Sequence, residues 1–173
     1  SKLDDEKRLG EILAENKSRA RMRLENASHS AAVARATSYF SPTSSYNDLT
    51  GGIGYFHFLE KICRDYENPK NRGPLMQKLK DVCSRLFTLD HMLVSYTADE
   101  EGFALLAGAM KKLTDALKNS DGKRYPFVFS AQNQNEGFKT SSQVNYVARC
   151  GSFREKGYEY TGALRILKLI LSY

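Results

Sequence analysis

The chain has 173 residues, enough for one ordinary domain with a hydrophobic core or for parts of two. Hydrophobic residues make up 41% and charged residues 27%, a composition that fits a globular protein and argues against a disordered one. The formal net charge of +6 does not by itself exclude binding to nucleic acid or to an anionic membrane.

Two helices are predicted at the N-terminal end. Apolar residues at helical spacing predict one long helix from Leu3 to about Glu25, which Asn26 can end. Ser28 is a candidate N-cap for a second helix over residues 28–40, rich in alanine. Ser41-Pro42 breaks this helix, and a short turn is expected over residues 44–49.

Two further helices follow. The glycines at 51, 52 and 54 open a third helix that reaches Glu67, with an aromatic and aliphatic face. Prolines and a glycine over residues 69–74 form the next break, and Pro74 suits the first position of a fourth helix. That helix is expected to reach Leu86.

The second half mixes predicted strands and helices. Alternating residues predict strands over 91–97 and 143–150. Asp99 is expected to cap a fifth helix reaching about Lys118, and the last helix is expected over 160–173. The fold class is therefore α/β (α+β), predominantly helical with few strands.

The polar, irregular composition of residues 126–142 predicts an interdomain linker. It separates a helical unit with one strand, residues 1–125, from a second unit that begins with a strand and a helix, residues 143–173. The last helix ends on an apolar residue without a C-cap signal, so the natural chain is expected to continue.

The basic residues are not concentrated on one segment. The densest run lies between Lys17 and Arg23, and Glu11 and Glu15 stand just before it. This pattern favours a solvated helix face, and no nucleic-acid partner is expected. The C-terminal run LRILKLILSY is too short to span a bilayer, so no membrane partner is expected either.

The number and spacing of the cysteines and histidines indicate the redox compartment and whether the chain could bind a metal. The three widely spaced cysteines, Cys63, Cys83 and Cys150, argue against a disulfide scaffold and for a reducing compartment. We expect a cytoplasmic protein, or one of an organelle matrix in a eukaryote. The histidines show no ligand spacing among themselves or with the cysteines, which disfavours a structural zinc site.

Local motifs do not assemble a reaction centre. His57 and Glu60 form H-x-x-E, but Lys61 stands where a zinc site would need a second histidine. The glycines of residues 51–54 could cradle an anion at a helix N-terminus, although a tight turn is the simpler interpretation. Two more candidates are weaker: a thiol nucleophile at Cys150, and an acidic cluster of Tyr96, Asp99, Glu100 and Glu101. No catalytic, cofactor-binding or metal-binding residue is assigned.

Longer runs carry a family resemblance. Lys17–Arg19, His29, the A-x-x-R-A run of 32–36, Ser41-Pro42 and the glycine-rich turn of 51–59 resemble the third domain of presequence proteases. These form a branch of the insulysin/pitrilysin family of zinc metallopeptidases. The runs QVNYVARCGSF and GALRILKLILSY resemble the opening of the fourth domain in that branch.

The resemblance implies a noncatalytic segment of an intracellular zinc metalloendopeptidase that degrades peptides in a closed chamber. Zinc, held by H-x-x-E-H and a distant glutamate, would belong to the full-length parent, and this chain would hold no cofactor and be inactive alone. Its partners would be the rest of the parent polypeptide, peptide substrates, and a second copy through the C-terminal helix. The alternative is a standalone basic α/β module that binds nucleic acid or a protein.

Overall fold

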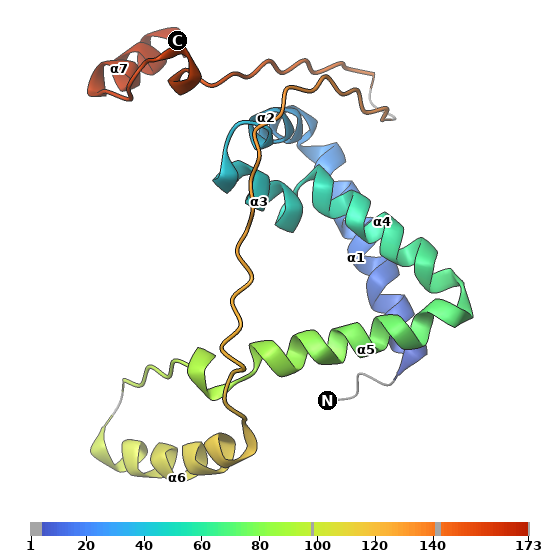
Figure 1. Cartoon of the computed structure of the whole chain (residues 1–173), viewed down its shortest axis with the longest axis vertical. Coiled ribbons are helices and arrows are strands. Elements are labelled where there is room, and N and C mark those ends of the chain that lie inside the picture. Colours follow the sequence, from blue (N-terminus) through green and yellow to red (C-terminus); the bar gives the residue numbers. More distant parts are fainter. Residues whose placement is uncertain (1–4, 98, 141–142, 173) are drawn as a thin grey trace. The chain divides into compact units, whose positions relative to one another are not determined.

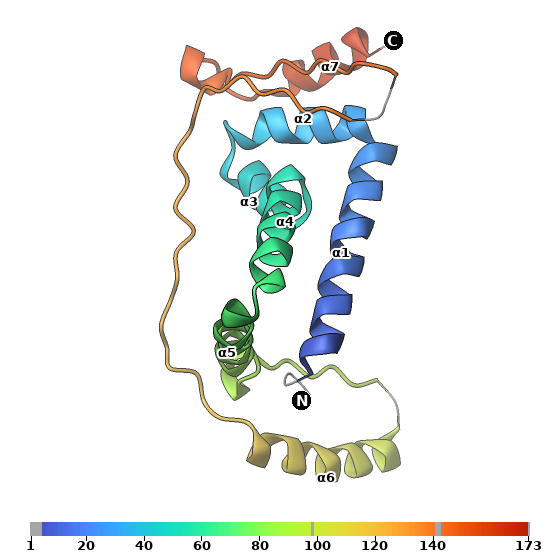
Figure 2. The same ribbon diagram turned by 90° about the vertical axis from the view of Figure 1, so that its right-hand side faces the viewer.

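The computed structural model describes residues 5–97, 99–140 and 143–172 and is helical throughout its regular elements (Figures 1 and 2). Contacts divide it into two units. Unit 1 comprises Ser1–Ala14 with Lys61–Phe127, and unit 2 comprises Glu15–Glu60 with Val128–Tyr173. The predicted helical character is confirmed. Within the described ranges no strand forms, so the α/β part of the predicted class is not confirmed.

The first helix, α1 (Glu6–Asn26), follows the prediction and ends at Asn26 as expected. The Asp5 carboxylate accepts a hydrogen bond from the Arg8 backbone N–H at 2.9 Å, which satisfies a donor that the first turn leaves without a partner. Leu3 lies outside the described residues. The first part of α1 belongs to unit 1 and the rest to unit 2.

The second helix, α2 (Ser28–Ser38), begins where predicted, but Ser28 is not its N-cap. Ala27 occupies that position without a side-chain cap. The Ser28 hydroxyl donates instead to the carbonyls of Leu24 and Glu25, at 3.2 and 2.8 Å. The serine therefore satisfies the last turn of α1 rather than the first turn of α2.

The turn predicted over residues 44–49 is wrong, because a third helix, α3 (Pro42–Gly51), occupies that segment. Ser41 is its N-cap and accepts from the Ser44 N–H at 3.3 Å, and Pro42 stands in the first helical position. The Ser-Pro pair that ends α2 thus also starts the next helix. α3 packs against α2 (Figure 1).

A single turn joins α3 to α4 (Ile53–Glu67), as the glycine-rich sequence predicts. Gly52 has an extended backbone, and its N–H donates to the Asp48 carbonyl at 3.0 Å. Ile53 and Leu59 are buried and supply apolar packing for unit 2.

The helix that the sequence predicts to start at Pro74 is α5 (Pro69–Leu86), and it begins five residues earlier, at Pro69. Asn68 caps it by accepting from the Lys70 N–H at 3.1 Å, and Pro69 rather than Pro74 takes the first position. Pro74 lies inside the helix, where it removes one hydrogen-bond donor close to the N-terminal end.

Tyr66, near the end of α4, contacts both α1 and α5 within unit 1. Its hydroxyl donates to the Glu6 carbonyl of α1 at 2.7 Å, and the Arg72 guanidinium of α5 lies 5.3 Å from the ring centre. Burial raises the pKa of this phenol. The contact explains Gly10 as well, since a Cβ there would come within 3.2 Å of the Tyr66 ring.

The strands predicted over 91–97 and 143–150 are wrong for the described residues, which are irregular there. Alternating side chains suit a strand, but a strand forms only where a neighbouring backbone supplies hydrogen-bond partners. A short 3₁₀ helix, η1 (Leu89–His91), takes up the first residue of the segment 91–97. The predicted capping of α6 (Glu100–Ala116) is confirmed, because the Asp99 carboxylate accepts from the Gly102 N–H at 2.8 Å.

The C-terminal part contains a second 3₁₀ helix, η2 (Arg154–Lys156), and α7 (Gly162–Leu171), which is shorter than the predicted helix. Neither α6 nor α7 contains a buried residue within the described chain. The residues Leu167, Ile170 and Leu171 in α7 are 47–75% exposed. No helix among the described residues is long and apolar enough to cross a membrane.

Candidate functional site

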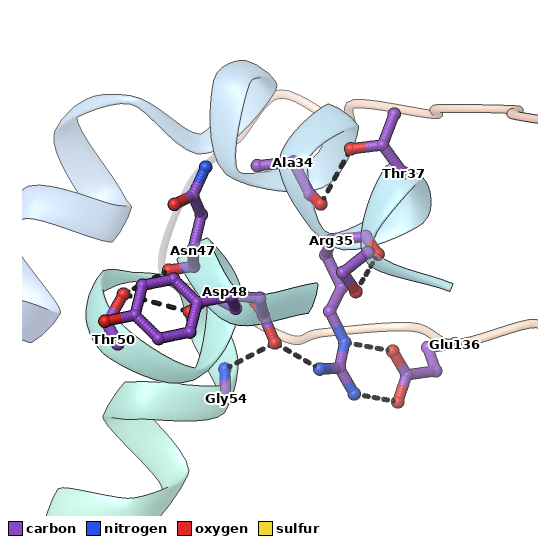
Figure 3. A network of polar contacts seen from close by, with 10 residues as sticks. Ala34, Arg35, Thr37, Asn47, Asp48, Thr50, Gly54 and Glu136 are labelled. Carbon is purple, nitrogen blue, oxygen red and sulfur yellow. Dashed lines mark hydrogen bonds and ion pairs between the residues drawn. The ribbon is translucent and has the colours of Figure 1, made fainter. Parts of the chain in front are cut away.

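The best-formed polar cluster of unit 2 is centred on Arg35 of α2 (Figure 3). Its Nη1 donates to Asp48 Oδ2 at 2.6 Å. On the other side, Nε and Nη2 donate to the two carboxylate oxygens of Glu136 at 2.7 and 2.9 Å. One guanidinium therefore joins α2, α3 and a segment about a hundred residues further along the chain, using the two-pronged geometry that arginine offers to carboxylates.

Asp48 is the buried member of the cluster, with 4% of its surface exposed. Its Oδ2 also accepts from the Gly54 N–H at 3.2 Å, at the start of α4. The turn is built around this carboxylate, because a Cβ at Gly52 or Gly54 would come within 2.5 Å of one of its oxygens. The anion cradled by the glycine-rich turn is thus the protein's own aspartate.

Glu136 lies in the segment predicted to be an interdomain linker. Besides its bond to Arg35, the segment is held by the Gln132 N–H, which donates to the Tyr39 carbonyl at 3.0 Å. The Phe138 ring lies 5.9 Å from that of His57. Residues 132–138 therefore lie against the helices of unit 2 through three separate contacts. The chain passes between the two units at three points, and one of them, from Phe127 to Val128, falls inside the predicted linker; the predicted domain boundary itself stays a prediction.

Tyr39 completes the cluster from the end of α2. The Arg35 guanidinium carbon lies 5.0 Å from its ring centre, a cation–π contact. The Tyr39 hydroxyl is close enough to Glu136 to affect its titration, yet among the described atoms it makes no hydrogen bond of standard geometry. Asp48 Oδ1 is likewise buried without a hydrogen-bond partner in the described part of the chain.

The electrostatics follow from the contacts. The hydrogen bonds from Arg35 lower the pKa of Glu136 to about 2, against the opposing effect of burial. The same bonds raise the pKa of Arg35, with Asp48 adding to the effect. Burial raises the pKa of the Tyr39 phenol, and Glu136 reinforces the shift. Both groups are charged at neutral pH, and the lowered pKa of Glu136 keeps its carboxylate charged further into the acid range.

The H-x-x-E motif does not become a metal site. His57 and Glu60 are exposed on α4, and the ammonium of Lys61 pairs with Asp65 at 2.9 Å. Across the described residues, no three His, Cys, Asp or Glu side chains gather where they could hold a metal ion. These residues do not fit a zinc site.

The other sequence candidates are structural where the chain is described. Cys150 is half-buried on an irregular segment. Asp99 caps α6, Glu100 and Glu101 stand in its first turn, and the Tyr96 ring lies 6.0 Å from that of Phe103. The acidic cluster therefore serves the start of a helix, where carboxylates are favoured.

The residues that matter most in the cluster were not singled out from the sequence. Arg35 belongs to the A-x-x-R-A run, but Asp48 and Glu136 were not identified. Asp48 precedes two glycines by four and six residues, and that pattern could have indicated a carboxylate turned back on a helix start. Nothing local distinguishes Glu136. The cluster lacks a nucleophile with a base beside it, so it positions chain segments and has no evident chemistry.

Comparisons with known proteins agree with this structural role. Residues 1–62 match the family of regions associated with peptidases of family M16, subfamily C. The chain is 30% identical to "Protein HypA" of Clostridium perfringens over 171 residues, which cover 99% of this chain and 17% of that protein. It is 24% identical to "Presequence protease 1, chloroplastic/mitochondrial" of Arabidopsis thaliana over 97% of this chain and 16% of that protein.

The predicted family resemblance is confirmed: the chain resembles a fragment of an M16-family peptidase. It spans less than a fifth of the length of either relative. No solved structure matches it. The peptidase-associated family match contains Arg35, Asp48 and the glycine turn, while Glu136 lies beyond it. The comparisons support a peptidase-associated, noncatalytic region.

Replacement of Gly54 by alanine should destabilise the helices of unit 2 by about 1–3 kcal/mol, the range for forcing extra volume into a packed site. The added Cβ would meet Asp48 Oδ2 at 2.5 Å. Gly51→Ala is the matched control, because a Cβ there meets nothing within 4 Å and should change stability by less than about 0.5 kcal/mol. Denaturant unfolding followed by circular dichroism measures both. Equal effects of the two substitutions would contradict the packed-carboxylate account.

Acid should weaken the attachment of Glu136 in a defined window. In the folded chain the pKa of Glu136 is about 2, below its ordinary value of about 4.5. The unfolded state therefore binds more protons in acid, and the stability of the folded state falls as the pH drops from about 4.5 to about 2. The loss should be about 1–2 kcal/mol, less than the full pKa difference implies, because 28% of the side chain is exposed and solvent screens the pair.

Glu136→Gln should remove most of this pH dependence, whereas Glu155→Gln, at an exposed position, should preserve it. Unfolding curves between pH 7 and about pH 2 make the comparison. A wild type and a Glu136→Gln variant that lose stability in parallel would show that other carboxylates dominate.

Proposed function

We propose that this chain is a noncatalytic segment of a zinc metalloendopeptidase, in which it forms part of the wall of a closed chamber where peptides are degraded. The observation that carries the proposal is the similarity of nearly the whole chain to segments of two much longer proteins, one of them named as a presequence protease. The Arg35 cluster supports it, because every contact there positions the chain and none prepares a reaction.

The zinc belongs elsewhere in the proposed parent enzyme. The described residues offer no ligand group, and the one histidine motif has Lys61 in place of a second histidine. No catalytic step is therefore assigned to this chain. Its contribution is to hold α2, α3, α4 and residues 132–138 in a fixed arrangement.

The exposed apolar surfaces support a role inside a larger assembly. α6 and α7 bury none of their described residues, and single globular domains rarely leave such faces uncovered. In the parent enzyme the cover for both helices would be the rest of the polypeptide, and in the isolated chain the cover for α7 would be α7 of a second copy. The proposed location is the cytoplasm or an organelle matrix, because an odd number of widely spaced cysteines suits a reducing compartment.

The proposal is tested with the polypeptide whose reading frame contains this chain and, in parallel, with the chain alone. The longer polypeptide should carry zinc and hydrolyse an unfolded peptide, and a chelator should stop the hydrolysis. The chain alone should bind no stoichiometric zinc and cleave nothing. Metal analysis measures the zinc content of each protein, and a peptide-cleavage assay measures its hydrolysis of the peptide. Stoichiometric zinc in the chain alone, or a longer polypeptide without peptidase activity, would overturn the proposal.

A further inference from the structure

A second feature of unit 2 lies apart from the Arg35 cluster. A cavity of about 370 Å³ is lined by one face of α1 and by residues from the α3–α4 junction. The lining residues are Asn16, Arg19, Ala20, Arg23, Thr50 and Tyr55. The volume lies at the lower end of the range that small-molecule sites occupy, so it suits a small ligand.

Arg23 gives the cavity a positioned positive charge. Its Nη2 donates at 3.2 Å to the carbonyl of Gly51, the last residue of α3, and this bond fixes the direction of the guanidinium. Among the described residues no carboxylate lies within ion-pair distance of it, unlike Arg21, whose Nε donates to Glu25 at 3.0 Å. Arg23 therefore retains N–H donors for another acceptor.

Arg19 adds a second guanidinium one helical turn away. Like charges four residues apart on a helix repel each other, and an anion between them would relieve that repulsion. Arg19 pairs with Glu15, but the two side chains are 72% and 54% exposed, so solvent screens this pair and it competes weakly. The cavity is lined by no carboxylate among the described residues.

The remaining lining residues fit the same kind of ligand. Ala20 is 3% exposed and forms a closed, apolar part of the wall. Asn16 and Tyr55 also line the cavity, and an amide and a phenol hydroxyl are side-chain groups that can donate hydrogen bonds. Planar guanidinium groups match the paired oxygens of phosphate and carboxylate, and they do so better than ammonium groups.

We propose that this cavity binds the oxyanion group of a small ligand, a phosphate or a dicarboxylate, between Arg19 and Arg23. The site is independent of the proposed peptidase role and is not assigned by the family match. It also gives a role to the basic run of α1 that a uniformly solvated helix face would not have.

The test is titration of the full chain with inorganic phosphate and, in a separate arm, with succinate, at constant ionic strength and followed by NMR of arginine side-chain N–H signals. Saturable shifts of Arg19 and Arg23 are expected in at least one arm, and the stronger arm identifies the ligand class. Arg23→Gln should weaken binding about tenfold or more, since a hydrogen-bonded charge is lost.

Arg21→Gln is the matched control, because it removes the same charge from the same helix outside the cavity and should leave binding unchanged. Arg23→Lys keeps the charge and should give an intermediate affinity, so a folding defect in Arg23→Gln can be recognised. No saturation in either arm, or equal weakening by Arg21→Gln and Arg23→Gln, would overturn the proposal. Duplex DNA that binds the same arginines more tightly than both anions would also overturn it, by making the face a nucleic-acid surface.

Discussion

The guanidinium of Arg35 joins two carboxylates that come from distant parts of the chain, and the arrangement of unit 2 depends on that connection. Asp48 cannot be buried at 4% exposure without a positive partner, because an unpaired buried charge is costly. The turn from α3 to α4 then closes around the same carboxylate, which is why Gly52 and Gly54 must lack a Cβ. Glu136 completes the set and brings residues 132–138 to the helices.

The Arg35 cluster fixes the positions of chain segments and contains no group arranged for a reaction. Removing the charges of an ion pair from water offsets much of their mutual attraction, so the largely buried Arg35–Asp48 pair is evidence for a fixed position more than for added stability. Its atoms without partners in the described chain, Asp48 Oδ1 and the Tyr39 hydroxyl, are places where buried water is expected to complete the hydrogen bonding. A segment built in this way suits a scaffold within a longer enzyme. It does not suit a reaction centre, where a nucleophile or a metal would have to be accessible.

Local sequence signals predicted most of the helices, and their failures have physical causes. Asp99 and Asn26 mark a helix start and a helix end correctly, because capping depends on neighbours a few residues away. The α3 helix was missed because serine, asparagine and aspartate suit turns as well as first helical turns. The strands predicted over 91–97 and 143–150 fail for a different reason, since pairing depends on backbone that lies elsewhere. The candidate site shows the same limit more sharply, because a carboxylate in the run SAQNQNEG has no local feature that assigns it to an arginine 101 residues away.

The central claim is that Arg35 couples residues 132–138 to the helices of unit 2 through Glu136. A double-mutant cycle with Arg35→Gln, Glu136→Gln and the combined variant measures that coupling directly, using denaturant unfolding at neutral pH. The sum of the two single losses in unfolding free energy should differ from the loss in the combined variant by about 1 kcal/mol or more, within the range for side chains in direct contact. Losses that add to within about 0.3–0.5 kcal/mol would contradict the account, because independent sites behave in that way.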